Sequence, residues 1–315
     1  MSRPRKAILA GTIVLVTLYA GASAYFAGII VAFNTNSLEQ DRQNLGIEGP
    51  AQFGLPEPVD VRVDTGGAVL AGWLFRNPAR KRCAVIISHG HTGTRYGALK
   101  YAPIFFERGC AVLTLDARHH GESTGEYGTY GYYESQDLAE ATGWLAQQLG
   151  ITTQEIGLVG ESMGASISML AAARLPDGPA FVLADSCFRS LPAILSYQGE
   201  KQYGPVVLGL LPGALLIADL RADFDASEVS PEDAAAKLHV PVILIHSSSD
   251  EYTPPEHSAA IFERLPDERK ALHITNWGAT HGRSIDTNYG SYAALVSAFL
   301  DQYVPAFARP QALAR

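Results

Sequence analysis

Basic residues form no long run in this 315-residue sequence, and cysteine is scarce. The net charge of -8 argues against nucleic acid as a partner. The three cysteines, Cys83, Cys110 and Cys187, make up neither a disulfide framework nor a Cys-x-x-Cys pair. Charged residues account for only 18% of the chain and apolar residues for 47%, which indicates a globular protein rather than a disordered one.

Two of the cysteines, Cys83 and Cys110, stand where predicted strands begin. We interpret them as buried structural thiols. A disulfide between them is the alternative if the domain is exported, and the sequence does not decide because it leaves the distance between the two residues open.

Charge is also absent from a long segment near the N-terminus. Arg3, Arg5 and Lys6 are followed by residues 7–33, which contain no charged residue and are long enough to span a bilayer as a helix. We predict that residues 1–33 form an uncleaved single-pass anchor. Because the basic start is expected to stay in the cytoplasm, the rest of the chain is predicted on the non-cytoplasmic side.

A secretory signal peptide is the competing interpretation. Ala22-Ser23-Ala24 resembles a signal-peptidase site, and cleavage there would release the domain. The apolar run continues through residues 25–33, longer than the usual apolar core of a signal peptide, which favours the anchor. Residues 34–58 are then a polar connector that contains glycine and proline.

After the connector, apolar strands alternate with helical patterns. Residues 59–63 and 69–75 flank a turn and predict a hairpin at a sheet edge. The later alternation predicts an α/β fold, a mostly parallel central sheet with flanking helices. Strands are predicted near 84–88, 111–115, 156–160, 180–184, 241–246 and 270–274. Helices are predicted near 97–108, 132–149, 163–174, 255–265 and 289–304.

The stretch Gly160-Glu161-Ser162-Met163-Gly164 is the most informative motif. A short apolar run precedes it, and residues 165–170 follow with helical spacing. A strand, a sharp turn and a helix around Gly-x-Ser-x-Gly predict a nucleophile elbow, in which the turn lifts the serine hydroxyl clear of the sheet. Glycine at the two outer positions allows neighbouring backbone to pass close by.

Further motifs stand on the expected elements. The predicted strand at 84–88 opens into the loop His89-Gly90-His91, Asp250 follows the strand at 241–246, and His281 follows the last strand. With these residues the sequence resembles the α/β-hydrolase superfamily over about residues 59–304. More narrowly, it is similar to the membrane-anchored single-domain serine hydrolases.

The resemblance implies a triad of Ser162 as nucleophile, His281 as general base and Asp250 as the carboxylate that orients the histidine. It also implies an oxyanion hole made by the backbone N–H groups of His91 and Met163. No cofactor and no metal are implied.

Some candidate residues have a competing interpretation. Asp185 also follows a strand, but the loop around Asp250 matches the family's acid loop, so Asp185 is interpreted as bracing the entrance of a lid. The side chain of His91 is either a substrate contact or a solvated loop histidine. His119 and His120 lack the spacing of a zinc site, and their segment is interpreted as structural, with Asp116 paired to Arg118.

Residues 186–238 interrupt the alternation and are too long for an ordinary connection. In α/β-hydrolases lids are inserted at this place. Residues 205–220 within it are almost all apolar, so they are either a broken helix packed on the core or an apolar lid over an acyl pocket. The domain is predicted to end at 304, and residues 305–315 are predicted as a tail.

We conclude from the sequence that the protein is a serine hydrolase of an ester or thioester, with a small-molecule or lipid-like acyl substrate and contact with a membrane through its N-terminal helix. A serine peptidase and an acyltransferase with the same residues are the alternatives. A membrane-tethered binding module without catalysis is disfavoured by the intact Ser, Asp and His.

Overall fold

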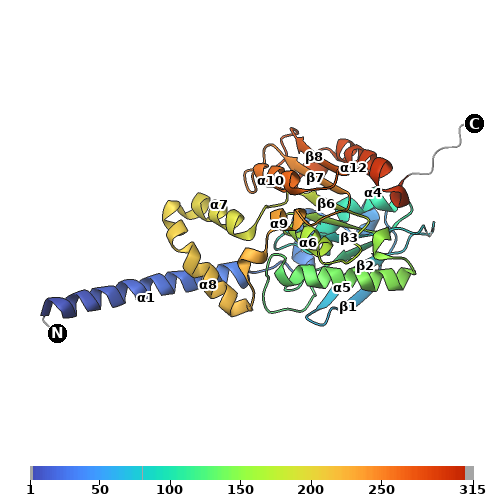
Figure 1. Cartoon of the computed structure of the whole chain (residues 1–315). Helices are drawn as coiled ribbons and strands as arrows, with labels where there is room; N and C mark the ends of the chain where they lie inside the picture. The colour runs from blue at the N-terminus through green and yellow to red at the C-terminus, as the bar shows by residue number, and fades with distance from the viewer. Residues whose placement is uncertain (1–2, 80, 309–315) are drawn as a thin grey trace, which may run out of the picture.

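The structure is a computed structural model that describes residues 3–79 and 81–308. Within these residues a single eight-stranded sheet has helices on both faces (Figure 1). Its strands are β1 (Val59–Asp64), β2 (Val69–Phe75), β3 (Ala84–Ser88), β4 (Ala111–Leu115), β5 (Ile156–Glu161), β6 (Phe181–Asp185), β7 (Val242–Ser247) and β8 (Lys270–Thr275). Its helices are α1 (Arg3–Val31), α2 (Leu38–Leu45), α3 (Arg95–Ala98), α4 (Ala102–Phe106), α5 (Tyr132–Leu149), α6 (Met163–Ala172), α7 (Leu191–Tyr203), α8 (Leu211–Ala222), α9 (Pro231–Ala235), α10 (Glu256–Arg264), α11 (Ser284–Thr287) and α12 (Tyr289–Tyr303).

The strand order is β1-β2-β4-β3-β5-β6-β7-β8. β1 and β2 form the antiparallel hairpin at one edge, β2 pairs antiparallel with β4, and all later pairs are parallel. The α/β-hydrolase fold predicted from the sequence is therefore confirmed. The parallel strands end at the same edge of the sheet, which is where loops of such folds carry functional residues.

Successive residues of the central strands face opposite sides of the sheet and belong to two separate apolar cores. Ile86 and Leu158 pack with α5, α6 and α10 on one face. Val85 and Val159 pack with α4 and α12 on the other. Both cores hold the loops at the carboxyl ends of the strands in fixed positions.

The helix expected over 97–108 is divided in the structure. A 3-10 turn at Leu99–Tyr101 lies between α3 and α4, and Pro103 stands in the first turn of α4. Proline has no backbone N–H to donate and is tolerated in the first turn of a helix, so a short helix begins there.

The two cysteines at the starts of strands form a disulfide, Cys83–Cys110, and not the free buried thiols favoured by the sequence. The next residues, Ala84 and Ala111, are register partners in the parallel pair of β3 and β4, which brings the two Cα atoms to 4.8 Å. Strand register is a tertiary property, so the pairing depended on information outside the local sequence. Cys187 is buried and free.

The predicted connector at 34–58 is ordered against the domain. α2 lies in it, and the buried carboxylate of Asp41 accepts hydrogen bonds from the backbone N–H and the hydroxyl of Thr94, each at 2.8 Å. At the other end of the chain, Phe307 is fully buried in the α12 core. Of the predicted tail, residues 309–315 lie outside the described residues.

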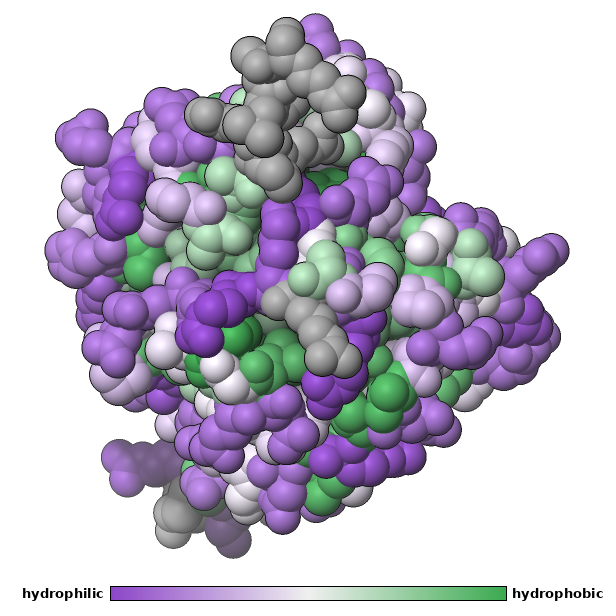
Figure 2. All heavy atoms as spheres, turned by 90° about the vertical axis from the view of Figure 1, so that its right-hand side faces the viewer, coloured by the Kyte–Doolittle hydropathy of each residue, from purple (hydrophilic) through white to green (hydrophobic). Residues whose placement is uncertain are grey.

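α1 projects from the body of the protein as one long helix, and α7 and α8 gather beside its C-terminal part (Figure 1). The side chains of α1 are exposed along its first turns and become buried only from Ser23 onward. The opposite face of the protein is mainly hydrophilic, with small scattered groups of apolar residues (Figure 2).

The inserted segment is neither a single broken helix nor a part of the sheet core. α7 and α8 form a third apolar cluster with the end of α1, in which Ala27, Ile30 and Val31 meet Ala214 and Ala218 of α8. The opposite side of α8 is apolar and exposed. The inserted helices are thus built on the N-terminal helix, a partner that the local pattern of residues 205–220 could not reveal.

Candidate active site

Ser162 stands on the sharp turn between β5 and α6. Its backbone has φ 53° and ψ -113°, and positive φ is costly for a residue other than glycine. A Cβ on Gly160 would overlap with the backbone of Gly164, and one on Gly164 would overlap with the carbonyl of Ser88. The two glycines of the motif are therefore needed so that strand, turn and helix can pack closely.

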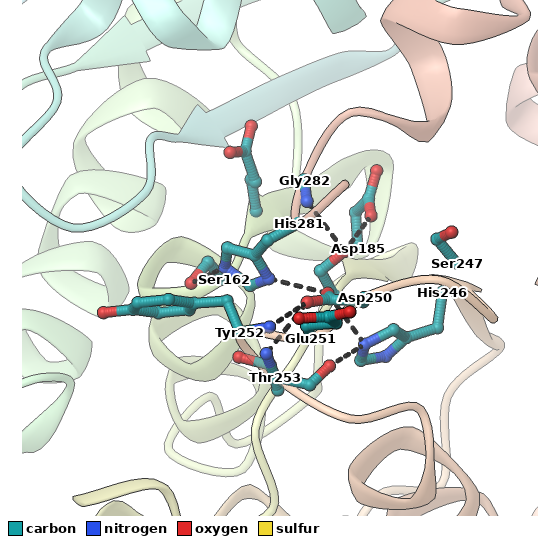
Figure 3. Close-up of polar contacts among 12 residues, drawn as sticks. Ser162, Asp185, His246, Ser247, Asp250, Glu251, Tyr252, Thr253, His281 and Gly282 are labelled. Atoms are coloured by element: carbon teal, nitrogen blue, oxygen red, sulfur yellow. Dashed lines mark hydrogen bonds and ion pairs between the residues drawn. The ribbon is translucent and has the colours of Figure 1, made fainter. Parts of the chain in front are cut away.

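Three predicted residues meet at this turn through a continuous chain of hydrogen bonds (Figure 3). Nε2 of His281 lies 2.7 Å from Oγ of Ser162, and Nδ1 of His281 lies 2.7 Å from Oδ2 of Asp250. The residues come from three different loops at the carboxyl ends of β5, β7 and β8. This arrangement allows the histidine to accept the serine proton while the carboxylate holds its tautomer.

The carboxylate of Asp250 is buried and held by several donors. Its Oδ1 accepts the backbone N–H groups of Tyr252 and Thr253, each at 2.9 Å, and Nε2 of His246 lies 3.1 Å from Oδ2. Burial alone would raise the pKa of Asp250, but the hydrogen bonds from His246 and His281 outweigh it and hold the pKa well below its usual value. Asp250 is therefore ionised near neutral pH.

The carboxylate of Asp185, the competing candidate, is hydrogen-bonded to other side chains, whereas Asp250 is the carboxylate bonded to His281. Its Oδ2 accepts the hydroxyls of Tyr101 at 2.8 Å and Tyr292 at 2.9 Å, and the hydroxyl of Ser186 donates to its Oδ1 at 2.9 Å. Burial raises the pKa of Asp185. Its backbone carbonyl accepts the N–H of Ser162 at 2.8 Å, so Asp185 braces the elbow itself rather than the entrance of the lid.

Two side chains hold the backbone beside His281. Nζ of Lys100 donates to the carbonyl of Gly282 at 2.7 Å, and the N–H of Gly282 donates to Oγ of Ser186 at 3.2 Å. Lys100 also forms an ion pair of 2.6 Å with Glu161, the residue before the serine. Burial would lower the pKa of Lys100, but Glu161 and Asp286 raise it, so the lysine is charged.

Both predicted oxyanion donors border the serine. Met163 is the first residue of α6, where a helix has unpaired N–H groups. His91 lines the same cleft as Ser162, and across the described residues its N–H donates to no protein acceptor. Both groups are available to an oxyanion.

The side chain of His91 is half-buried against aromatic rings at the edge of the cleft. Its ring lies between Phe33, with centroids 4.2 Å apart, and Tyr130, with centroids 5.2 Å apart. Burial, with smaller contributions from His89 and His119, lowers the pKa of His91 to about 4. The imidazole is therefore neutral near pH 7 and packs the loop against the end of the N-terminal helix.

The adjacent pair His119 and His120 is structural. Nε2 of His119 bonds with the carbonyl of Phe33 at 2.9 Å, and Nδ1 of His120 bonds with that of Arg118 at 2.8 Å. Across residues 3–79 and 81–308, no group of three or more metal-ligating side chains comes together. Arg118 pairs with Asp137 at 2.6 Å and not with Asp116 as expected, because α5 brings that carboxylate beside it.

A cleft of about 630 Å³ opens over Ser162 and His281. This volume is typical of pockets that hold small molecules. Its walls come from the oxyanion loop, the elbow, α7 and the loops after β7 and β8. The lining residues are Gly90, His91, Thr92, Glu161, Ser162, Gln198, Lys201, Ser249, Glu251, Tyr252, Thr280 and His281.

His246 and Lys100 are supporting residues that the sequence analysis missed. His246 lies at the end of a predicted strand four residues before Asp250, and its position beside a candidate acid was a usable signal. Lys100 lies in a helical region between β3 and β4, and nothing in its local sequence marks its contact with Gly282, 182 residues later.

Comparison with known families matches residues 32–203 to the family described as X-Pro dipeptidyl-peptidase (S15 family). The uncharacterized protein YqkD of Bacillus subtilis is 36% identical over 218 residues, which cover 69% of this chain and 70% of that protein.

Two solved structures show the same fold. The esterase Pf2001 of Pyrococcus furiosus has a TM-score of 0.67 at 24% identity and covers 86% of this chain and 99% of its own. Est1E of Butyrivibrio proteoclasticus, solved with ferulic acid bound, has a TM-score of 0.60 at 20% identity and covers 78% of this chain and 99% of its own.

Proposed function

Because this chain belongs to the family described as X-Pro dipeptidyl-peptidase (S15 family) and is a serine hydrolase of the α/β-hydrolase fold, we propose that it cleaves a carboxylic ester or thioester. The observation that carries the proposal is the hydrogen-bonded chain from Ser162 through His281 to Asp250 at the base of an open cleft. No cofactor takes part.

The reaction proceeds by acyl transfer to the serine. His281 takes the proton of Ser162 as Oγ of the serine attacks the substrate carbonyl. The resulting oxyanion accepts hydrogen bonds from the N–H groups of His91 and Met163. His281 then gives the proton to the leaving alcohol or thiol. Water, activated by the same histidine, cleaves the acyl-enzyme, while Asp250 stabilises the imidazolium that forms in each half-reaction.

Ester chemistry is supported by the solved proteins of similar fold, one an esterase and one holding ferulic acid, although their likeness concerns the fold alone. Peptide cleavage is the second candidate because of the description of the matched family. Comparing p-nitrophenyl butyrate with glycyl-prolyl-p-nitroanilide on one preparation separates the two. Adding an alcohol acceptor and analysing products distinguishes an acyltransferase.

The N-terminal helix supports a place at a membrane. Within the described residues, the segment Pro4–Val31 is the helix long and apolar enough to cross a bilayer, a property that signal sequences share. The proposed orientation leaves the hydrolase domain on the non-cytoplasmic side. The disulfide Cys83–Cys110 supports this orientation, since disulfides persist in oxidising compartments. The hydrophilic face opposite α1 suits a domain that lies in water beside the membrane, on either side of it (Figure 2).

The test is labelling of the full-length protein in detergent with a fluorophosphonate probe, together with ester turnover. Ser162→Ala should abolish labelling and lower kcat by about 10⁴-fold or more. Ser291→Ala, the same change at an exposed position of α12, should leave both unchanged. Labelling of folded Ser162→Ala, or its near-normal turnover, would remove Ser162 from the mechanism, and a wild type that neither labels nor turns over would indicate a binding module.

A further inference from the structure

A second cavity, of about 210 Å³, lies between the end of the N-terminal helix and the inserted helices. Phe26, Ile29 and Ile30 of α1 form one wall together with Phe33, the second residue after the helix. The opposite wall comes from the inserted segment, with Leu195, Val207, Leu208, Leu210, Leu211 and Ala214. We call this space the helix pocket.

The helix pocket adjoins the catalytic cleft. His91, Gln198 and Tyr252 line both spaces. The ring of Tyr252 lies with its centroid 4.8 Å from that of His281, and Gln198 of α7 is hydrogen-bonded to the carbonyl of Tyr252. The two spaces therefore share one border, and an arm of a substrate whose carbonyl stands at Ser162 has to pass Tyr252 to reach the helix pocket.

The residues that line the helix pocket indicate which kind of chemical group fits there. No charged residue is among the residues that line the pocket, and glutamine, histidine and tyrosine provide its polar atoms. A charged group would lose its hydration there without a partner. The volume is below the roughly 300–1,000 Å³ of pockets that hold whole ligands, which suits one narrow apolar part of a substrate.

The position of α1 explains how such a substrate arrives. The helix has 29 residues and a length of about 43 Å at 1.5 Å per residue, whereas the hydrocarbon core of a bilayer is about 30 Å thick. About 20 residues suffice to span it, and the side chains of α1 become buried against the inserted helices from Ser23 onward. If α1 spans the membrane as proposed, the helix pocket lies where the helix leaves the bilayer.

We propose that the helix pocket binds the acyl chain of the ester or thioester cleaved at Ser162, so that α1 forms a wall of the substrate site as well as an anchor. The substrate class is an acyl ester or thioester with a chain of medium length or longer, taken from the bilayer surface. This proposal rests on the proposed function, because it needs acyl transfer at Ser162.

The first experiment measures kcat/KM of the full-length protein in lipid nanodiscs for p-nitrophenyl esters of acetate, butyrate and octanoate. Each methylene buried contributes about fourfold (~0.8 kcal/mol), so octanoate should exceed butyrate by on the order of a hundredfold. Leu211→Trp fills the helix pocket and should lower the octanoate-to-butyrate ratio at least about tenfold. Leu220→Trp, the same change on the exposed side of α8, is the matched control and should keep the wild-type ratio.

A second pair of variants tests the contribution of α1 itself. Ile29 lines the helix pocket while part of its side chain is exposed, so Ile29→Trp should narrow the pocket and lower the octanoate-to-butyrate ratio as Leu211→Trp does. Tyr25→Trp, an exposed position one turn earlier on the same helix, should not. If Leu211→Trp does not fold, Leu211→Ala replaces it and should lower the octanoate-to-butyrate ratio severalfold.

Failure of this proposal differs from failure of the proposed function. One outcome overturns the helix pocket but keeps the proposed hydrolase activity. In it the wild type is labelled by the probe and turns over acetate, but it shows no preference for octanoate, or the pocket and control variants change the ratio equally. Absence of labelling and of turnover for every ester overturns both. A falling ratio in Leu211→Trp and Ile29→Trp alone supports the pocket.

Discussion

Gly213 in α8 lies so close to Ser23 in α1 that a side chain at position 213 would overlap with side-chain atoms of α1. A Cβ at Gly213 would lie 2.5 Å from Oγ of Ser23 and 2.8 Å from the ring of Tyr19. Small residues at such crossings let two helix backbones approach each other, as in membrane helix pairs. The inserted segment is therefore attached to the N-terminal helix at this crossing.

We expect Gly213→Leu to separate α8 from α1, because overpacking a tight contact costs about 1–3 kcal/mol. Gly209→Leu is the matched control in the same segment, since a Cβ at Gly209 meets no atom within 4 Å. Limited proteolysis of the full-length protein should cleave residues 186–238 faster in Gly213→Leu than in wild type. Equal protection of the two variants would show that the crossing does not hold the segment.

The two carboxylates near the elbow should respond differently to the same substitution. Asp250→Asn removes the charge that orients His281 and should lower kcat by about ten-thousandfold with little change in KM. Asp185→Asn disturbs the hydrogen bonds from Tyr101 and Tyr292 and should mainly lower the melting temperature. The measurements are steady-state kinetics and thermal unfolding on both purified variants. The opposite ranking in kcat would assign the acid to Asp185.

Much of the fold and of the candidate site could be predicted from the sequence because both depend on local patterns of residues. The hairpin, the parallel strands and the helix after Ser162 follow from apolar periodicity and from glycine at fixed positions. The order of Ser162, Asp250 and His281 along the chain identified which side chains to expect together, and the structure brings them within hydrogen-bonding distance. Their catalytic roles remain a prediction until the variants are measured.

The remaining features depend on contacts between distant segments. The disulfide follows from the register of β3 against β4, and Arg118 pairs with Asp137 because α5 crosses the loop after β4. The apolar segment 205–220 looked equally suited to a core or to a lid, since its partner is a helix almost two hundred residues earlier. Periodicity reports which face of a helix is apolar and not what covers that face.

The membrane proposal predicts that the full-length protein stays with the membrane fraction after carbonate washing, because a mainly apolar helix of 29 residues that spans the bilayer is not displaced by high pH. In spheroplasts, protease added from outside should digest the hydrolase domain. N-terminal sequencing of the mature protein provides the control. A soluble form that begins at Tyr25 would indicate a cleaved signal peptide, and protection of the domain from external protease would reverse the orientation.

His91 predicts how stability depends on pH. Its pKa is lowered to about 4 by burial between Phe33 and Tyr130, whereas an unfolded histidine titrates near 6.5. Between these pH values His91 is protonated in the unfolded state and neutral in the folded state. Its contribution to the free energy of unfolding is therefore fully present above about pH 6.5 and is lost as the pH falls toward 4. The shift corresponds to about 3 kcal/mol at most, less for a side chain that keeps some contact with solvent.

Replacing this ring by an aromatic ring without a titrating group should remove its share of the acid sensitivity. We expect His91→Phe to lose less free energy of unfolding than wild type between pH 7.5 and 4.5, by about 1–3 kcal/mol. His239→Asn, at an exposed position, should follow the wild-type curve. The measurement is denaturant unfolding of the full-length protein in one detergent across that range. Some acid sensitivity remains in every variant, since burial also lowers the pKa of His257 to about 4. Parallel curves of unfolding free energy against pH for His91→Phe and wild type would mean that burial does not hold His91 neutral.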